Sequence, residues 1–468
     1  MLGIELQRNS SISLSRQLYL EFVGRIADGR LKSGERLPST RELASHLGIS
    51  RNTVCEAYDM LLAEEYIVSR QGAPTRVMHG IGPDIGPGRT ETKSKAEHFK
   101  YLRPVEADFH TGRPDLGAFP IQRWLSLTYR SSSLLKPEQW GYTDPEGFMP
   151  LREEIAGWLL RSRGISVAPR DIFITAGATQ ALHLLSEMLF EPPYEILTED
   201  PCHLGMMRAM RTRGYSVVSC PVDEHGLETE KLKGSHSKLI YVTPSHQFPL
   251  GGILTANRRA ELIRHAADSK AYIIEDDYDS EFRYGGPPVA PLRTLDPGRV
   301  IYAGTFSKIL FPALRIGYVI LPRELQDRWR YLRIHSDVQN PLFEQAALAE
   351  FMCSRQFDRH VGKMRKLYGQ KRKILLDAIK TEFGDLPGCW GDAAGLHMAI
   401  SFPGAIFNRQ FERHCRLSEL IIQTVDRHCI VKGTHPDKLL LGYGHLSPEA
   451  IKSGLSLLHT CIDSWQNK

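Results

Sequence analysis

Apolar residues in the first 80 positions recur at helical spacing. Residues 37–66 read LPSTRELASHLGISRNTVCEAYDMLLAEEY. Ser39, with Glu42 three residues later, predicts a capping box that starts a short helix, and Gly48 is typical of its end. A second helix is predicted to begin near Arg51, because its apolar positions fall three, four, seven and eight apart. These positions are Val54, Ala57, Tyr58, Leu61 and Leu62.

Two short helices joined by a glycine-containing turn are typical of a helix-turn-helix. The stretch YIVSRQGAPTRVM that follows predicts two strands around a Gly-Ala-Pro turn, which would form a wing. The first module is therefore predicted to be a winged helix-turn-helix with α+β structure.

A different pattern begins near residue 105. The runs DIFITAG, KLIYVTP, AYIIEDDYD and RVIYAGTFS are short, apolar and end in polar residues, which is typical of buried parallel strands. ATQALHLLSEMLF and TANRRAELIRHAADS have helical period and are predicted to be crossover helices. This pattern predicts an α/β domain in which ligands bind at the carboxyl ends of the strands. From about residue 340 the pattern is mostly helical, with GLHMAI and KLLLGY as strands, which predicts a smaller α+β lobe.

Between these patterns the chain is rich in glycine, proline and small polar residues, which predicts an exposed linker at residues 80–104. The predicted domains are residues 1–79 and 105–468. No apolar run approaches the roughly 18 residues of a membrane span. The eight cysteines are scattered without a C-x-x-C pair, so we expect neither a disulfide framework nor a metal cluster. A cytoplasmic protein with reduced thiols is expected.

The N-terminal end of the second helix of such a module enters the DNA major groove. Arg51, Asn52 and Thr53 lie there and are predicted to reach bases or phosphates. Ser39 and Arg41, at the start of the first helix, are placed for the DNA backbone. Basic and acidic residues nearly balance in this module, so the choice of double-stranded DNA over a protein-interaction role rests on the pattern.

Lys308 stands in the apolar stretch TFSKILFPALRIGY. An apolar setting lowers the pKa of a lysine and lets its amine form a Schiff base with an aldehyde, for which pyridoxal 5'-phosphate is the obvious candidate. That cofactor needs a carboxylate at its pyridine nitrogen and a donor to its ring hydroxyl. Asp276 is predicted for the nitrogen, with Asp277 as the alternative, and Tyr278 for the hydroxyl.

The phosphate of the cofactor needs an anion site. TAGATQAL places small residues between a predicted strand and a helix, where backbone amides bind phosphate. An arginine in the lysine stretch is suited to two-point phosphate contact. The predicted cup consists of Gly177, Ala178, Thr179, Thr305, Ser307 and Arg315.

Residues 12–78 resemble the winged helix of the GntR family, with Glu65 where that family usually has glycine. From about residue 108 to 460 the chain resembles fold type I aminotransferases, through GYTDPEGFMPLREEIAGWLLRSRG, TPSHQFPLGGIL, EDDYDSEFRYGG and TFSKILFPALRIGY. The two parts together resemble the MocR subgroup of GntR regulators, which is named for this fusion.

The resemblance implies that Lys308 carries the cofactor, with Asp276 at the pyridine nitrogen and Tyr278 at the ring hydroxyl. It places His246 where aminotransferases have an asparagine near that hydroxyl. It also implies a homodimer, often head-to-tail, in which Tyr142 reaches the phosphate of the neighbouring subunit.

Two departures from the family pattern concern the ligand. Where many relatives have an aromatic ring on the cofactor, this chain has EDPCH, so His203 is expected to stack instead. Leu440, in KLLLGYGHL, stands where aminotransferases place an arginine for the substrate carboxylate. Arg113, Arg123 and His445 are alternative anchors, and Arg113 is predicted to bind the effector because its loop enters the large domain.

The sequence thus predicts a pyridoxal-phosphate-dependent transcription regulator that binds DNA and senses an amine or amino-acid effector. The effector would displace Lys308 and form an external aldimine. One alternative is a working aminotransferase with an accessory DNA-binding module, which the missing arginine disfavours. Another is a sensor of pyridoxal phosphate itself that regulates vitamin B6 genes. Whether any transaminase turnover remains is left open.

Overall fold

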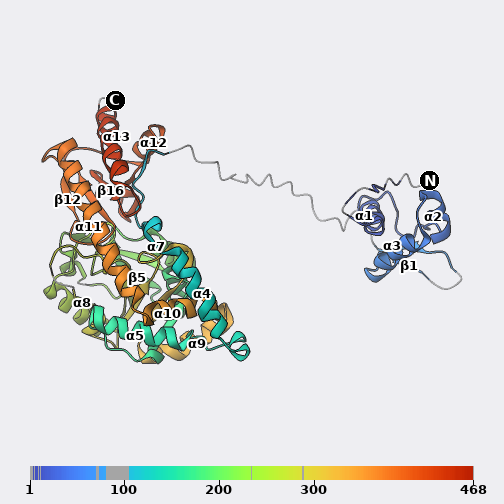
Figure 1. Cartoon of the computed structure of the whole chain (residues 1–468), viewed down its shortest axis with the longest axis horizontal. Helices are drawn as coiled ribbons and strands as arrows, with labels where there is room; N and C mark the ends of the chain where they lie inside the picture. Colours follow the sequence, from blue (N-terminus) through green and yellow to red (C-terminus); the bar gives the residue numbers. More distant parts are fainter. Residues whose placement is uncertain are drawn as a thin grey trace. The chain divides into compact units, whose positions relative to one another are not determined.

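The computed structural model divides the chain into two compact units, Met1–Tyr101 and Leu102–Lys468 (Figure 1). The structure describes residues 4, 6–8, 10, 12–69, 73–80, 105–232, 234–286 and 289–466. Residues 81–104 of the predicted linker and residues 70–72 of the predicted wing turn lie outside the described residues.

The first unit contains the predicted helix-turn-helix. Its elements are α1 (Leu14–Ala27), α2 (Thr40–Leu47), α3 (Arg51–Ala63), β1 (Ile67–Val68) and β2 (Arg76–Val77). Helix α2 begins at the predicted capping box: Ser39 Oγ accepts from Glu42 N at 3.2 Å, and Ser39 N donates to Glu42 Oε2 at 3.4 Å. Gly48 ends α2 with φ 63°. Strands β1 and β2 pair antiparallel, as expected for a wing.

The turn after α3 explains one departure from the GntR pattern. Glu65 has φ 59°, in the left-handed region that favours glycine. The chain adopts that conformation with a glutamate, so the path of the backbone into the wing is kept without the glycine.

The second unit is built on an eight-stranded sheet of order β4-β11-β10-β9-β8-β5-β6-β7. The strands are β4 (Ile172–Thr175), β5 (Glu195–Asp200), β6 (Ser216–Asp223), β7 (Gly226–Leu227), β8 (Leu239–Val242), β9 (Tyr272–Asp277), β10 (Val300–Thr305) and β11 (Gly317–Ile320). Strands β8, β9 and β10 are parallel neighbours, as their buried apolar runs predict. Strands β5 and β6, which were not predicted, extend this parallel sheet beyond β8. Strand β11 was not predicted; it is antiparallel to both β10 and β4.

Helices cover this sheet and build the rest of the unit (Figure 1). They are α4 (Ile121–Leu134), α5 (Met149–Arg163), α6 (Ala178–Met188), α7 (Leu204–Arg213), α8 (Ala256–Ser269), α9 (Gln326–Ser336), α10 (Leu342–Cys353), α11 (Gln356–Phe383), α12 (Arg409–Leu417) and α13 (Pro448–Gln466). The smaller lobe was predicted to begin near residue 340. Helix α10 begins at Leu342 but packs on α4 and α5, so the smaller lobe begins later in the chain than predicted. No helix in the described part of the chain is long and apolar enough to cross a membrane.

The smaller lobe has a four-stranded sheet of order β12-β13-β16-β15. Its strands are β12 (Gly388–Trp390), β13 (His397–Ser401), β15 (Gln423–Thr424) and β16 (Lys438–Gly442). The predicted strands GLHMAI and KLLLGY are β13 and β16. The first strand after the linker, β3 (Ala107–Asp108), pairs in parallel with β14 (Leu420–Ile421), so the chain enters this unit at the smaller lobe.

Candidate cofactor and effector site

A cavity of about 440 Å³ lies where β8, β9 and β10 end and α6 begins. Its position agrees with the rule that ligands bind at the carboxyl ends of parallel strands. The predicted residues that line it are Ala178, Thr179, His203, Asp276, Tyr278, Thr305, Ser307, Lys308 and Arg315.

Lys308 presents its amine to this cavity. Burial lowers the pKa of Lys308, against the opposing effect of the Asp279 and Asp276 carboxylates. Lys308 Nζ donates to the backbone oxygen of Gly112 at 2.6 Å. A lysine with a lowered pKa is more often neutral, and only the neutral amine is a nucleophile.

The two neighbouring aspartates of β9 have different surroundings. Asp277 Oδ2 accepts from Arg163 Nη2 at 2.7 Å and from Tyr302 Oη at 2.5 Å, so it is part of a buried ion pair. Asp276 lines the cavity; Oδ2 accepts from Tyr241 Oη at 2.7 Å, and buried Oδ1 has no hydrogen-bond partner among the described residues. Burial raises the pKa of Asp276 to about 6. This geometry favours Asp276 over Asp277 as the partner of a protonated ring nitrogen.

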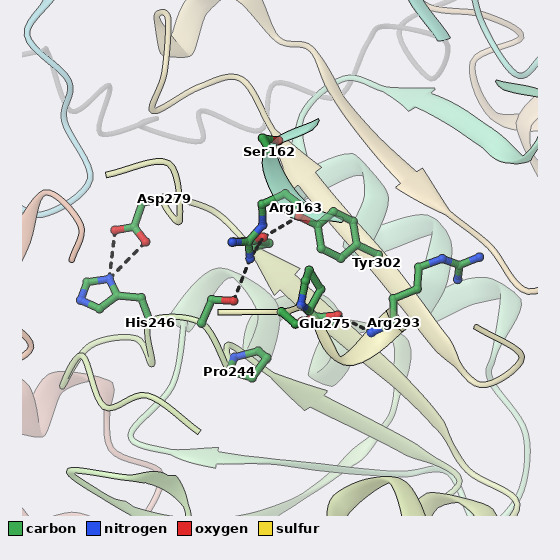
Figure 2. A network of polar contacts seen from close by, with 12 residues as sticks. Ser162, Arg163, Pro244, His246, Glu275, Asp279, Arg293 and Tyr302 are labelled. Atoms are coloured by element: carbon green, nitrogen blue, oxygen red, sulfur yellow. Dashed lines mark hydrogen bonds and ion pairs between the residues drawn. The ribbon is translucent and has the colours of Figure 1, made fainter. Parts of the chain in front are cut away.

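His246 lies behind Tyr278 rather than in the cavity wall. Its Nδ1 is 3.1 Å from both carboxylate oxygens of Asp279 (Figure 2). Its Nε2 is 3.3 Å from the Gly391 oxygen. Both ring nitrogens thus face acceptors. Burial opposes the charged form, but the Asp279 carboxylate raises the pKa of His246. Tyr278 Oη donates to the His246 backbone oxygen at 3.0 Å, which fixes the tyrosine at the cavity.

The predicted phosphate cup is assembled around the start of α6. No side chain caps that helix within the described ranges, so its first amides remain available to an anion. Gly177 has φ 79°, and a Cβ there would lie 3.0 Å from Arg315 Nη2. Arg315 Nη2 donates to the Ala176 oxygen at 2.6 Å, and Thr305 Oγ1 donates to Ser307 Oγ at 3.0 Å. Hydroxyls, amides and a guanidinium therefore converge where a phosphate would bind.

Other predicted residues have different positions. His203 Nδ1 accepts from Met206 N at 3.3 Å and caps α7, while its ring faces the cavity. Tyr142 is 90% exposed and does not line this cavity. Arg113 is outside the cavity lining as well, and its Nη1 pairs with Asp108 Oδ2 at 2.5 Å. Leu440 is fully buried in the core beside Ala399.

Several residues of the cavity were missed from the sequence. Tyr241, in the predicted strand KLIYVTP, donates to Asp276. His397 is buried, with Nε2 at 3.2 Å from the Pro249 oxygen, and it also lines the cavity. Further lining residues without a predicted role are His110, Arg208, Gln423, Arg427 and His428.

The residues present fit pyridoxal phosphate. One cavity contains a lysine amine, an aspartate oxygen without a partner among the described residues, a tyrosine hydroxyl, and a helix start that no described side chain caps, with an arginine beside it. These groups suit the aldehyde, the ring nitrogen, the ring hydroxyl and the phosphate, respectively.

The predicted DNA-binding residues lie in the first unit. Arg51 and Asn52 are exposed at the start of α3, and Arg51 Nε donates to Thr40 Oγ1 at 3.4 Å. The Thr53 hydroxyl is 2.8 Å from Ser50 Oγ, so it is partly engaged in capping α3. Ser39 and Arg41, at the start of α2, are also exposed.

Comparison with known families gives two matches. Residues 14–77 match the family of bacterial regulatory proteins called the gntR family, and residues 108–421 match aminotransferase class I and II. Among solved structures, an archaeal alanine:glyoxylate aminotransferase is similar, with a TM-score of 0.72 and 26% identity; the match covers 78% of this chain and 92% of that one.

Two regulators are similar in sequence. The probable rhizopine catabolism regulatory protein MocR of Rhizobium meliloti is 32% identical over 471 residues, which cover 98% of this chain and 95% of that protein. The pyridoxine biosynthesis transcriptional regulator PdxR of Corynebacterium glutamicum is 34% identical over 386 residues, 82% of each chain.

Proposed function

Because the chain belongs to the MocR subgroup of the GntR family of transcription regulators, we propose that it controls transcription in response to an amine effector that engages Lys308. Its first unit is a DNA-binding domain, and its second unit binds pyridoxal 5'-phosphate. When bound, this cofactor supplies an aldehyde carbon that takes up a primary amine. Lys308 would hold the cofactor through that carbon, and an effector amine would compete with Lys308 for it.

One observation carries this proposal: among the described residues, the groups that the cofactor needs line the cavity, whereas Leu440 stands where aminotransferases place an arginine for the substrate carboxylate. Lys308, Asp276 and the start of α6 supply what the cofactor needs. Leu440, at the expected arginine position, is buried in the core. Amine exchange needs only the cofactor groups. Transamination of an ordinary amino acid also needs a residue that holds the carboxylate of the substrate. Sensing is therefore favoured over turnover.

Binding of the effector regulates DNA binding only if the effector has different affinities for two arrangements of the protein. A homodimer, with a head-to-tail arrangement as the family suggests, provides such arrangements. Large exposed apolar side chains on and after α4 support a contact with a second copy of the chain. They are Leu125, Tyr129, Leu134, Trp140 and Tyr142. In this dimer Tyr142 reaches the phosphate site of the neighbouring subunit.

The test is a visible absorbance titration of the cofactor-loaded protein with amines and amino acids, with keto-acid release assayed in the same tubes. Binding to a DNA duplex selected by this protein from a random-sequence pool is measured in parallel. The proposal requires a spectral shift and a change in DNA affinity without keto acid. A band that bleaches while keto acid accumulates would identify an aminotransferase.

A second candidate function is a sensor of pyridoxal phosphate itself, which the similarity to a pyridoxine biosynthesis regulator favours. The effector is then the cofactor, and occupancy of Lys308 varies with its concentration. In that case adding pyridoxal phosphate to the dialysed protein changes DNA affinity, and no amine is needed.

A further inference from the structure

Leu440, which stands where aminotransferases have an arginine, has a polar residue opposite it on the neighbouring strand. Leu440 on β16 pairs directly with Gln423 on β15. Leu440 is fully buried in the core, whereas Gln423 lines the cavity and is 6% exposed. An amide, not a guanidinium, is therefore the polar group that this edge of the smaller sheet contributes to the cavity.

The hydrogen bonds of His110 orient this amide. His110 Nδ1 is 3.2 Å from the Thr111 oxygen, which only accepts, so Nδ1 carries the proton. With the proton on Nδ1, the lone pair of His110 Nε2 faces Gln423 Nε2 at 3.4 Å and accepts from it. Gln423 Oε1 is left buried, without a partner in the part of the chain that the structure describes.

An unpartnered buried carbonyl oxygen destabilises the empty cavity, and a ligand that donates a hydrogen bond to it recovers this free energy. A carboxylate cannot donate, so it would meet Gln423 Oε1 as a second acceptor. A hydroxyl group can donate to this oxygen and still accept from a neighbour.

Three histidines of the cavity wall favour the neutral form. Burial lowers the pKa of His203 to about 4 and that of His428 to about 3, and it lowers the pKa of His397 well below its usual value. Neutral imidazoles both donate and accept, which suits hydroxyl groups. Arg427 Nη1 is paired with Glu412 Oε2 at 3.3 Å. Arg208 on α7 also lines the cavity and is the rival anchor for a carboxylate.

We infer that the effector is a hydroxylated primary amine, such as an amino alcohol or amino sugar, whose hydroxyl donates to Gln423 Oε1 in place of a carboxylate held by arginine. This inference rests on the proposed function, because it names the chemical class of the amine that engages Lys308.

The test titrates the cofactor-loaded full chain with matched pairs that differ only in the terminal group: ethanolamine and glycine, propanolamine and β-alanine, serinol and serine. Dissociation constants come from the visible absorbance shift and from calorimetry. We expect the alcohol of each pair to bind at least about tenfold more tightly, as one recovered hydrogen bond allows. If the amino acids bind more tightly, the inference is wrong while amine sensing stands. If no amine changes the spectrum, the proposed function fails too.

Variants test the residues. Gln423→Leu should remove the preference for the alcohols, and Leu440→Arg should reverse it in favour of the amino acids. Gln410→Leu is the matched control, because Gln410 is an exposed glutamine on α12 that does not line this cavity. The inference is overturned if the preference for alcohols survives in Gln423→Leu but disappears in Arg208→Gln. That result would assign recognition of the ligand to Arg208.

Discussion

The DNA-binding unit and the cofactor cavity differ in whether their polar groups have hydrogen-bond partners within the protein. At the starts of α2 and α3, Ser39 and Ser50 satisfy backbone amides locally, and the arginines there point outward from completed helices. In the cavity, Asp276 Oδ1 and Gln423 Oε1 are buried without partners within the described residues. Since buried polar atoms are normally paired, the cavity is incomplete without a ligand, whereas the DNA-reading surface is stable by itself.

The substitution Lys308→Ala should separate the two regions most clearly, because it should affect the cavity and not the DNA-binding unit. We expect complete loss of the lysine-bound cofactor band and of the response to amines, because no other group supplies that amine. DNA affinity without effector should be unchanged. Absorbance after gel filtration and fluorescence anisotropy with DNA measure the two effects. Lys363→Ala, at an exposed lysine of α11, is the control. A remaining band in Lys308→Ala would disprove the assignment.

Asp277→Asn should cause the largest loss of stability. It leaves the buried Arg163 guanidinium without its charged partner, which costs about 3–5 kcal/mol of unfolding free energy. Urea unfolding of the second unit measures this loss. Asp296→Asn is the control, because its pair with Arg299 is partly exposed and 3.8 Å long, so the loss should stay below about 1 kcal/mol. Equal losses in both variants would contradict the ion-pair assignment of Asp277.

Asp276→Asn should instead change the pH dependence of stability. The pKa of Asp276 is about 6 in the folded protein against 3.8 for the ordinary group. Between these values the folded state binds more protons than the unfolded state, so the stability of the cofactor-free protein falls as pH rises from about 4 to about 6. The variant lacks this contribution and should gain about 2–3 kcal/mol relative to the parent over that range. Melting temperatures across this range test it; a gap between the two proteins that is independent of pH would refute it.

Arg51→Ala should weaken DNA binding by about 1–3 kcal/mol if the guanidinium contacts a base edge. The cofactor absorbance should stay the same, because the cavity is formed by the second unit alone. Anisotropy titrations at several salt concentrations measure the effect. Arg359→Ala, at an exposed arginine of α11, should bind DNA like the parent protein.

The smallest effect is expected for Ser39→Ala. Loss of the cap of α2 should destabilise the first unit by about 1 kcal/mol. Ser45→Ala, at an exposed position inside the same helix, should change stability much less. Thermal unfolding followed by circular dichroism distinguishes the two variants, and equal melting temperatures would show that the cap contributes nothing.

The sequence predicted what depends on local pattern. The caps of α2, the start of α3 and the parallel strands β8, β9 and β10 follow from residue spacing and burial. Strand β11 was missed because four residues, Gly317–Ile320, carry no periodicity of their own and are defined by pairing between β10 and β4.

Most residues predicted for the cofactor line one cavity because each stands at the end of a strand, just after one, or at the start of a helix. Tyr241 and Gln423 could not be predicted, since their roles depend on register: Tyr241 lies one strand away from Asp276, and Gln423 lies opposite Leu440. The sequence shows that Leu440 replaces the arginine. It does not show that Gln423 lies opposite, because that depends on the pairing of β15 with β16.

The hydrogen bond from Lys308 to the Gly112 oxygen has a mechanical consequence. Lys308 can make this bond only while its amine is free. Gly112 lies four residues after β3, the first strand of the chain segment that arrives from the DNA-binding unit. The free amine of Lys308 therefore holds the loop that follows β3 against the cavity, so a change at this nitrogen changes a contact of the segment through which the chain enters the second unit.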